Sequence, residues 1–340
     1  MNILVIGGSG FIGTALIREL LTLGYYVRNF DKNPSVDFSE LSTIADVRDK
    51  DALKEALKEV DVVFNLAAEH RDDVRPVTLY YDVNVQGARN IVEAAELNNV
   101  KRIIFTSTVA VYGLNKNEPD ENSPVEPFND YGRSKLQAEE VFKRWASGSD
   151  GRSLVIVRPT VIFGEGNRGN IYTLINLIAD KKFVMVGRGE NRKSMAYVGN
   201  IVKFLAQTID FPGGVHIFNY ADKPDMTVKE LVEFIRGEFG LNSRPMIRLP
   251  YSIGLIGGYT FDILSSITGK KYPISSIRIR KFCANTTVST KALEEMGFKP
   301  SHTLREGLKR MVLSMTPNDN TRIRLRGSEG IYKPENKSDK

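Results

Sequence analysis

The chain has 340 residues, of which 41% are hydrophobic and 26% are charged, and its formal net charge is +6. This composition is ordinary for a soluble globular protein. A single cysteine, Cys283, excludes an intramolecular disulfide and a cysteine-rich metal site, so we expect a cytoplasmic protein. The basic residues are scattered and lack interleaved aromatic residues, so nucleic acid is not an expected partner.

The sequence also argues against a membrane span. The apolar run of "MNILVIGGSG" stops after about six residues, which is too short for a signal peptide. No apolar stretch reaches the roughly 20 residues that a membrane span needs. The nearest, "YSIGLIGGYTFDILSSITG" from Tyr251, contains Asp262 and several glycines, so we expect it to contribute a helix to a folded lobe.

Short apolar runs alternate with amphipathic patterns along the first 160 residues. We predict strands at 2–7, 25–31, 61–68, 101–108 and 153–164, and helices at 11–24, 50–60, 86–100 and from Tyr131. Continuous apolar strands between amphipathic helices indicate a parallel sheet covered on both faces. The predicted fold class is therefore α/β, a doubly wound parallel sheet of the Rossmann type.

After Gly164 the pattern is less regular. It predicts a helix at 171–181, a strand at 215–221 that could rejoin the sheet, and a helix from Thr227 with a capping box to Glu230. We therefore expect a Rossmann domain over residues 1–160 and a smaller, interleaved substrate lobe over 161–315. Segments at about 195–220 return to the first domain, and the polar residues 316–340 are expected to form a flexible tail.

The motif "GGSGFIG" directly follows the first strand and opens the first helix. In this context Gly7 permits the turn, Gly10 lets the backbone approach a pyrophosphate, and Gly13 lets the helix pack closely on the strand. Phe11 and Ile12 lie at the helix N-terminus, where the phosphates would bind. The motif predicts a dinucleotide cofactor.

Asp31 ends the second predicted strand, 18 residues after Gly13. An acidic residue at this place accepts hydrogen bonds from the adenosine ribose. The same carboxylate would repel a 2'-phosphate, so NAD is favoured over NADP. Arg28 and Lys32 flank Asp31 and leave NADP as the less favoured alternative.

The motif "YGRSK" places Tyr131 and Lys135 four residues apart, on one face of a predicted helix. Tyr112 and Lys116 share this spacing, but the residues that follow Tyr112 are rich in Gly, Asn, Pro and Asp and indicate a loop. The spacing alone does not distinguish the two pairs, and we expect the Tyr112 pair to be a chance match.

With these motifs in one order, the chain resembles the extended short-chain dehydrogenase/reductases, in particular the NAD-dependent epimerase/dehydratase family that acts on nucleotide sugars. The resemblance runs from Met1 to about Met315 and rests on "GGSGFIG", "NLAA", "NVQGARNI", "FTSTVAVYG", "YGRSK", "VRPTVIFG" and "KSMAYVGNI". It implies that Tyr131 and Lys135 are catalytic, together with the hydroxyl of Thr108 or, as the fallback, Ser107. It also implies cofactor contacts from Asp46, Val47, Leu66, Ala67, Ala68, Asn84, Thr106, Pro159 and Thr160.

The chemistry implied by the resemblance follows from charges. A free tyrosine has a pKa of about 10, too high for a base at neutral pH. The ammonium group of Lys135 and a cationic nicotinamide both favour the phenolate. Tyr131 would take a proton from a sugar hydroxyl as C4 gives its hydride to NAD, and Thr108 would hydrogen-bond the same oxygen. The product is a 4-keto sugar.

Three fates of this ketone are known in the family. Dehydratases place an acidic pair directly after the strand hydroxyl, whereas here Val109 and Ala110 follow Thr108, so dehydration is not expected. We expect a 4-epimerase of a UDP- or GDP-hexose, because Asp31 favours NAD. The alternatives are an NAD(P)H-dependent 4-keto-sugar reductase and, less expected, a sensor that binds the dinucleotide without turnover.

The nucleotide-diphosphate sugar needs cationic or multi-donor partners in the second lobe. Asn170, Arg192 and Arg280 are our candidates. Cys283 and the three histidines show no metal-ligand spacing, so no metal is predicted. The resemblance implies a homodimer through the two helices that flank the active site.

Overall fold

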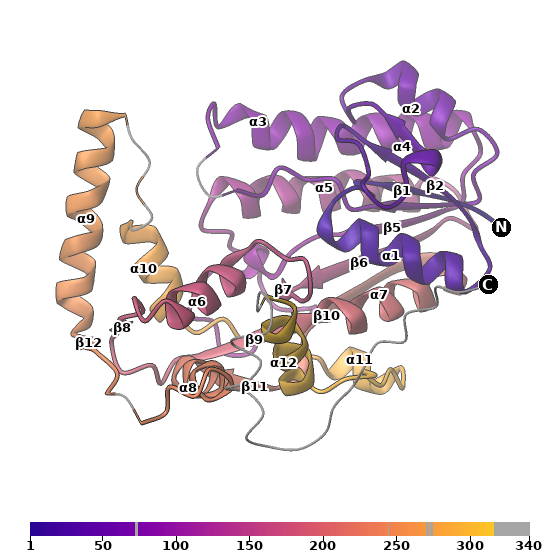
Figure 1. The fold of residues 1–340 in the computed structure, drawn as a ribbon. Coiled ribbons are helices and arrows are strands. Elements are labelled where there is room, and N and C mark those ends of the chain that lie inside the picture. Colours follow the sequence, from indigo (N-terminus) through magenta and orange to yellow (C-terminus); the bar gives the residue numbers. More distant parts are fainter. Residues whose placement is uncertain (72–73, 244, 270–271, 273–274, 316–340) are drawn as a thin grey trace.

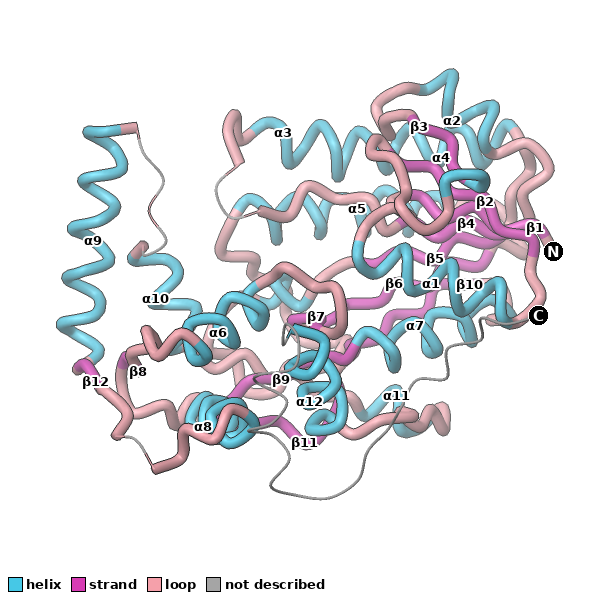
Figure 2. The backbone as a smooth tube through the Cα atoms, in the orientation of Figure 1, coloured by secondary structure: helices cyan, strands magenta, loops and turns pink. Residues whose placement is uncertain are grey.

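The computed structural model describes residues 1–71, 74–243, 245–269, 272 and 275–315 (Figure 1). The predicted tail, residues 316–340, lies outside the described residues. Strands of a central sheet lie between layers of helices, and a second lobe follows at one edge (Figure 2).

The elements of the first lobe agree closely with the predicted ones. The central sheet contains β1 (Asn2–Ile6), β2 (Tyr26–Asp31), β3 (Ser42–Ile44), β4 (Val62–Asn65), β5 (Arg102–Thr106), β6 (Ser153–Pro159) and β10 (Gly214–Tyr220). The helices around it are α1 (Phe11–Thr22), α2 (Lys50–Ala56), α3 (Thr78–Tyr81), α4 (Gly87–Leu97), α5 (Asp130–Ser147) and α7 (Val198–Gln207). Short turns are η1 (Ser39–Leu41), η2 (Asp82–Gln86), η3 (Val109–Tyr112) and η4 (Thr208–Asp210).

The second lobe is built from shorter pieces. Its strands are β7 (Val161–Phe163), β8 (Met185–Val186), β9 (Arg192–Tyr197), β11 (Asp222–Thr227) and β12 (Arg248–Leu249). Its helices are α6 (Asn170–Ala179), α8 (Val228–Glu238), α9 (Tyr251–Thr268), α10 (Ser276–Cys283), α11 (Lys291–Glu295) and α12 (Leu304–Met315). The predicted capping box of α8 is confirmed, with Thr227 and Glu230 each bonding the other's backbone. No described helix is long and apolar enough to cross a membrane.

Within the described residues the central sheet is parallel throughout, in the order β10-β6-β5-β4-β1-β2-β3. The chain runs outward from β1 to β3 and then crosses back to β4, so the strand order reverses between β1 and β4. Ligands of such sheets bind at this switch point, outside the carboxyl ends of the strands. The doubly wound fold class is confirmed.

The alternation of side chains along each strand divides the core into two layers. Ile3 and Val5 of β1 lie in the cluster that contains α1 and α7, whereas Leu4 and Ile6 lie in the cluster that contains α4 and α5. All four side chains are almost fully buried, and burying such a side chain stabilises the fold by about 1.5–3 kcal/mol. The continuous apolar strand is thus explained by a helix layer on each side.

The single strand predicted at 153–164 is wrong, because the chain forms two strands there. β6 ends at Pro159 in the central sheet, and β7 pairs with β9 in a separate three-stranded sheet. Pro159 has no N–H to donate, so it cannot continue a ladder on both sides. The backbone N–H of Thr160 bonds the carbonyl of Tyr220 at 3.0 Å as the chain leaves the sheet.

Candidate active site

The predicted cofactor residues gather at one edge because all strands of the central sheet point the same way. The glycine motif follows β1, Asp31 ends β2, Asp46 and Val47 follow β3, Leu66, Ala67 and Ala68 follow β4, Thr106 ends β5, and Pro159 and Thr160 lie at the end of β6. This edge faces the second lobe (Figure 1).

The glycine turn leaves no room for side chains on its inner side. Gly7 has φ +84°, and a Cβ there would lie 2.6 Å from the backbone nitrogen of Ala67. A Cβ at Gly13 would lie 2.4 Å from the carbonyl oxygen of Gly7. A Cβ at Gly10 would approach only this same oxygen, at 3.3 Å, so the open side of the turn is at Gly10.

The N-terminus of α1 is free to hold an anion. Gly10 is its N-cap, with no side-chain cap, and the first turn contains no acidic residue. The backbone N–H groups of Phe11 and Ile12 lie in this turn, where the helix dipole also favours negative charge. The cradle therefore fits the pyrophosphate of a dinucleotide.

Replacing Gly10 by alanine should separate cofactor binding from folding. The added Cβ would approach only the carbonyl oxygen of Gly7, at 3.3 Å, and a shift of a few tenths of an ångström accommodates it, so we expect the apo protein to lose no more than about 1 kcal/mol of stability. NAD affinity should fall about tenfold or more, because the pyrophosphate must move away from the N–H groups. Calorimetric titration with NAD checks this. Gly257→Ala is the matched control, since its Cβ would meet no atom within 4 Å and it lies on α9; equal NAD affinity of both variants would contradict the assignment.

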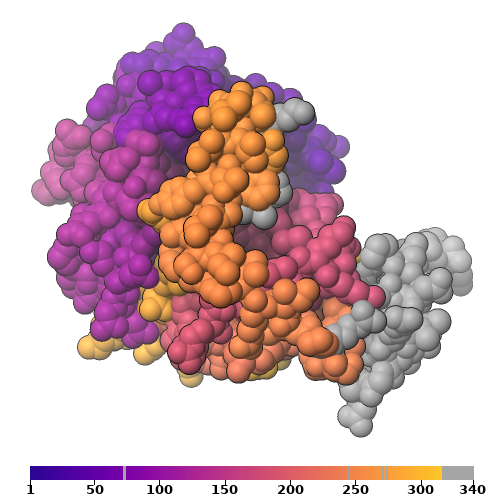
Figure 3. Space-filling model, turned by 90° about the vertical axis from the view of Figure 1, so that its left-hand side faces the viewer, coloured from indigo at the N-terminus to yellow at the C-terminus, as the bar shows by residue number. Residues whose placement is uncertain are grey.

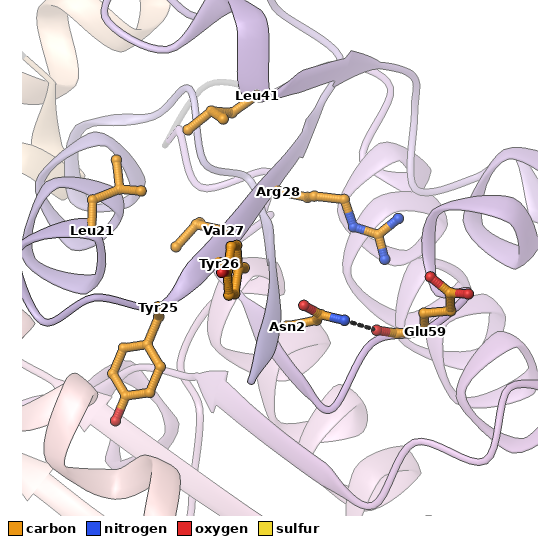
Figure 4. A pocket seen from close by; sticks show the side chains of 8 residues that line it. All are labelled: Asn2, Leu21, Tyr25, Tyr26, Val27, Arg28, Leu41 and Glu59. Carbon is orange, nitrogen blue, oxygen red and sulfur yellow. Dashed lines mark hydrogen bonds between the residues drawn. The ribbon is translucent and has the colours of Figure 1, made fainter.

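The carboxylate of Asp31 is held against the glycine turn. Its Oδ2 accepts a hydrogen bond from the backbone of Ser9 at 3.1 Å, and its Oδ1 accepts one from the backbone of Asn33 at 2.9 Å. Arg28 points to the opposite edge of the sheet, where its guanidinium donates to the carbonyl of Lys58 at 2.5 Å. It lines a surface hollow at the amino ends of β1 and β2 (Figure 4). Arg28 is therefore not placed to bind a 2'-phosphate.

Asp46 carries its own counterion. Arg48 donates to its two oxygens at 2.9 and 2.8 Å, and this pairing holds the pKa of Asp46 below its usual range. The next residue, Val47, is fixed by its backbone, because its carbonyl accepts a hydrogen bond from Asn90 at 3.0 Å. The carboxylate of Asp46 is thus ionised and positioned at the sheet edge.

Tyr131 and Lys135 are positioned by the start of α5. Asn129 caps this helix by accepting a hydrogen bond from the backbone of Gly132 at 2.9 Å, so Tyr131 lies in the first turn. Lys135 lies one turn further and is 1% exposed, with its ammonium 4.1 Å from the centroid of the Phe105 ring. Burial lowers the pKa of Lys135 to about 7, and the nearby Glu139 carboxylate opposes this shift.

The buried Lys135 should cost the apo protein stability in a pH-dependent way. Because its folded pKa is lowered, the unfolded state binds more protons between pH 7 and 10.5, and wild-type stability rises with pH through this window. Lys135→Met should therefore be more stable than wild type by a few kcal/mol at pH 7, and the advantage should shrink towards pH 10. Urea unfolding of both proteins at both pH values measures this, with the exposed Lys54→Met as control. An advantage that is the same at both pH values would contradict the account.

The structure distinguishes between the two candidate hydroxyl groups. Ser107 donates its hydroxyl to Oε1 of Glu139 at 2.5 Å and is thereby engaged in the core. Thr108 caps η3, and its Oγ1 accepts a hydrogen bond from the backbone of Ala110 at 3.1 Å, which leaves its proton for another acceptor. This geometry favours Thr108. The hydroxyl of Thr106 is buried and finds no hydrogen-bond partner among the described residues, which fits a cofactor contact.

Asn84 connects the end of β4 to α5, the helix that carries Tyr131 and Lys135. Its Nδ2 donates to the Ser134 hydroxyl at 2.9 Å and to the Glu69 carbonyl at 3.1 Å, and its Oδ1 accepts from the Glu69 backbone at 2.8 Å. Asn84 lies in η2, a π-helical turn, and such turns are frequent at functional sites. Its hydrogen bonds hold the segment after β4 against α5.

A buried ion pair beneath the site was not predicted from the sequence. Arg158 donates to the two oxygens of Glu139 at 2.9 and 2.6 Å, and both side chains are almost fully buried. Arg158 also donates to the hydroxyl of Tyr112 at 2.7 Å, and this hydroxyl donates to Asn219 at 2.8 Å. Tyr112 thus serves the core, while Lys116 pairs with Glu126, as expected for a chance match. The sequence contained one indication of this pair: Glu139 lies four residues after Lys135 and therefore on the same face of the helix.

The structure does not bring together the three residues that are candidates for substrate binding. Asn170 is exposed at the start of α6, and the guanidinium of Arg192 donates to the carbonyl of Asp225 at 2.9 Å. Arg280 donates to the hydroxyl of Tyr259 and lies over its ring. Arg192 and Arg280 therefore already have partners within the protein, and a diphosphate role for any of the three remains a prediction.

Comparison with known proteins gives consistent matches. The sequence pattern of the NAD dependent epimerase/dehydratase family matches residues 3–221. The N-acetyl-alpha-D-glucosaminyl-diphospho-ditrans,octacis-undecaprenol 4-epimerase of Escherichia coli O157:H7 is 54% identical, covering 91% of this chain and 93% of its own. The UDP-glucose 4-epimerase of Vibrio cholerae is 29% identical over 91% and 93% of the two chains. The structure of MoeE5 in complex with UDP-glucuronic acid and NAD has TM-score 0.74 and 25% identity, covering 92% of this chain and 98% of that chain.

Proposed function

Because the chain belongs to the NAD-dependent epimerase/dehydratase family, we propose that it is an NAD-dependent 4-epimerase of a hexose carried on a diphosphate. The observation that carries the proposal is the 54% identity to a sugar-diphosphate 4-epimerase. The cradle at Gly10 and the pair Tyr131 and Lys135 at one sheet edge give this activity its chemistry. The predicted epimerase class is confirmed by the relatives.

The residues would act on the sugar in turn. The cradle at Gly10 and Asp31 would hold NAD, which would supply reversible hydride transfer at C4, with return of the hydride to the opposite face of the ring. Tyr131, at the positive end of α5, would take the proton of the 4-hydroxyl and later give it back. Lys135 would stabilise the phenolate, and Thr108 would hydrogen-bond the same sugar oxygen. The ketone must rotate between the two steps.

The relatives differ in the carrier of the sugar. The sequence predicts a UDP- or GDP-hexose, and the name of the Vibrio cholerae relative supports uridine diphosphate. The more similar Escherichia coli relative is named for an N-acetylglucosamine joined through a diphosphate to undecaprenol. Both carriers present the same sugar-diphosphate linkage. We favour the polyprenol carrier, because the identity is 54% against 29%.

Asp31 should select NAD over NADP. Its carboxylate would repel a 2'-phosphate, and Arg28 is turned to the far edge of the sheet. Asp31→Ser should therefore improve NADP affinity relative to NAD by about tenfold or more, since the like charge beside the 2'-phosphate is removed. Competition of the two cofactors for the apo protein, followed by fluorescence of the reduced forms, measures the ratio. An unchanged ratio would contradict this role of Asp31.

A tightly held cofactor distinguishes the epimerase from the reductase. Denaturing the purified protein without added cofactor should release stoichiometric NAD or NADH, because the epimerase reuses it in place. A protein that is empty and that binds NADH or NADPH reversibly would instead support the 4-keto-sugar reductase. Turnover of a C4 epimer pair excludes the sensor.

Two further features remain proposals. We propose a homodimer through α4 and α5, the helices beside the site, and light scattering at several protein concentrations tests it. We also propose the cytoplasm as the compartment, because the lone Cys283 gives no sign of an oxidising environment.

A further inference from the structure

Helix α9 packs on the protein with one face only. A Cβ at Gly254 would lie 2.5 Å from the Val186 side chain, and one at Gly258 would lie 2.8 Å from the Ser276 backbone. One turn further, Asp262 accepts a hydrogen bond from the backbone of Ser276 at 3.1 Å. The spacing of four residues places these three positions on one face, which is held against β8 and α10.

The opposite face of α9 exposes an apolar stripe. It consists of Ile253 (53% exposed), Ile256 (65%), Ile263 (60%), Leu264 (38%) and Ile267 (74%), and we refer to it as the outer stripe. The four isoleucines are three, seven and four residues apart, so they follow one line along the helix. Asp262 is the one charged side chain of α9, and it faces α10.

The apolar surface continues beyond the helix. Ile247 and Leu249, directly before α9, are 64% and 38% exposed. α9 stands at the outside of the second lobe, on the left in Figure 1, which is the side to which the carboxyl ends of the sheet point. In Figure 3 this side faces the viewer, and α9 is the orange column at its surface. A group of large, exposed apolar side chains on one element and the strand before it marks an interaction site.

We propose that the outer stripe docks on the surface of an anionic lipid bilayer. The polar residues around it fit this occupant: Arg248, Arg278 and Arg280 are exposed on β12 and α10, and Tyr251 and Tyr259 are partly exposed on α9. Basic residues attract anionic headgroups, and tyrosines favour the boundary between headgroup and acyl chain. Because its inner face is held against β8 and α10, α9 would lie in the plane of the interface.

A second copy of this chain fits the outer stripe less well. Helices that pair in a coiled coil carry charged side chains beside the apolar seam, which set the partner and the register. α9 has no such charges beside its isoleucines. A bilayer needs none, because lipid tails impose no register.

The inference deepens the proposed function, on whose lipid-linked substrate it rests. A polyprenyl diphosphate keeps its chain in the bilayer, so its sugar can be reached only at the membrane surface. Docking through α9 would turn the carboxyl edge of the sheet, with Tyr131 and the cofactor cradle, towards that surface. The substrate then reaches the site without leaving the bilayer.

Vesicle flotation of the full-length protein tests the docking. The probe is vesicles of phosphatidylethanolamine and phosphatidylglycerol, with phosphatidylcholine vesicles for comparison. Wild type should float with the anionic vesicles, and Ile256→Ser with Ile263→Ser should lower the bound fraction about tenfold or more. The matched control is Val36→Ser with Leu23→Ser, which removes two apolar side chains of 98% and 54% exposure from surfaces away from α4, α5 and α9 and should float as wild type does.

Several results would overturn the proposal. These are absence of wild-type flotation, equal flotation of both double variants, or a wild-type dimer in light scattering that the stripe variant dissociates without any vesicle binding. Flotation reads binding without turnover, so it does not depend on the reaction. In detergent micelles, the stripe variant should epimerise a polyprenyl diphosphate sugar at the wild-type rate. If neither wild type nor either double variant epimerises this substrate, that result would count against the proposed function alone.

Discussion

Tyr131→Phe is expected to lower kcat by about 10²–10⁴-fold while the protein keeps its bound NAD. The substitution removes the hydroxyl that exchanges a proton with the sugar, and positioned acid–base groups contribute acceleration of this size. The ring stays in the first turn of α5, so the fold should be preserved. Steady-state epimerisation and the cofactor content of the purified protein are measured together. Turnover within a few-fold of wild type would contradict the catalytic role.

Tyr112→Phe provides the matched control for this experiment. It removes a hydroxyl from the other tyrosine that has a lysine four residues further on. That hydroxyl bonds Asn219 and Arg158 in the core, so its loss should reduce stability by about 1–3 kcal/mol. The kcat per folded molecule should change far less than in Tyr131→Phe.

Arg158→Met is expected to give the largest loss of stability, about 3–5 kcal/mol. It leaves the buried Glu139 carboxylate without its guanidinium partner, with only the Ser107 hydroxyl and the Lys143 ammonium, at 3.8 Å, beside it, and breaking a buried pair in this way is strongly destabilising. For a chain of this size the melting temperature should fall by about 6 °C. Calorimetry of the apo proteins measures the change.

The double variant Glu139→Leu with Arg158→Met is the informative control. Removing both charges leaves no unpaired ion, so it should recover much of the lost stability. A double variant as unstable as the sum of its single variants would show that the charges do not act as a pair. The double variant also removes the carboxylate that opposes the pKa shift of Lys135.

The first lobe could be predicted because its signals are local. The turn at Gly7 is fixed by φ +84° and by contact with Ala67, so glycine at this place reports backbone geometry directly. Asp31 meets the same turn through Ser9. Gly7 directly follows β1 and Asp31 ends β2. Because the strands are parallel, residues at their carboxyl ends meet at the same edge of the sheet.

The parts that were missed depend on contacts between distant segments. The pairing of Glu139 with Arg158 joins a helix to a strand, and neither residue forms a motif by itself. The chain leaves the central sheet after Pro159 because β7 finds a partner in β9, which lies later in the sequence. The arginines of the second lobe could not be placed, because Arg192 and Arg280 bind groups that spacing does not reveal.

The most direct test of the central claim is the fate of a deuterium at C4 of the sugar. The protein, without added cofactor, is given N-acetylglucosamine labelled at C4 and joined either to UDP or to polyprenyl diphosphate, and the product is examined by mass spectrometry and proton NMR. We predict the 4-epimer with its deuterium retained, because the same bound cofactor returns it. Loss of the deuterium, a requirement for added NADH, or accumulation of a 4-keto sugar would contradict it.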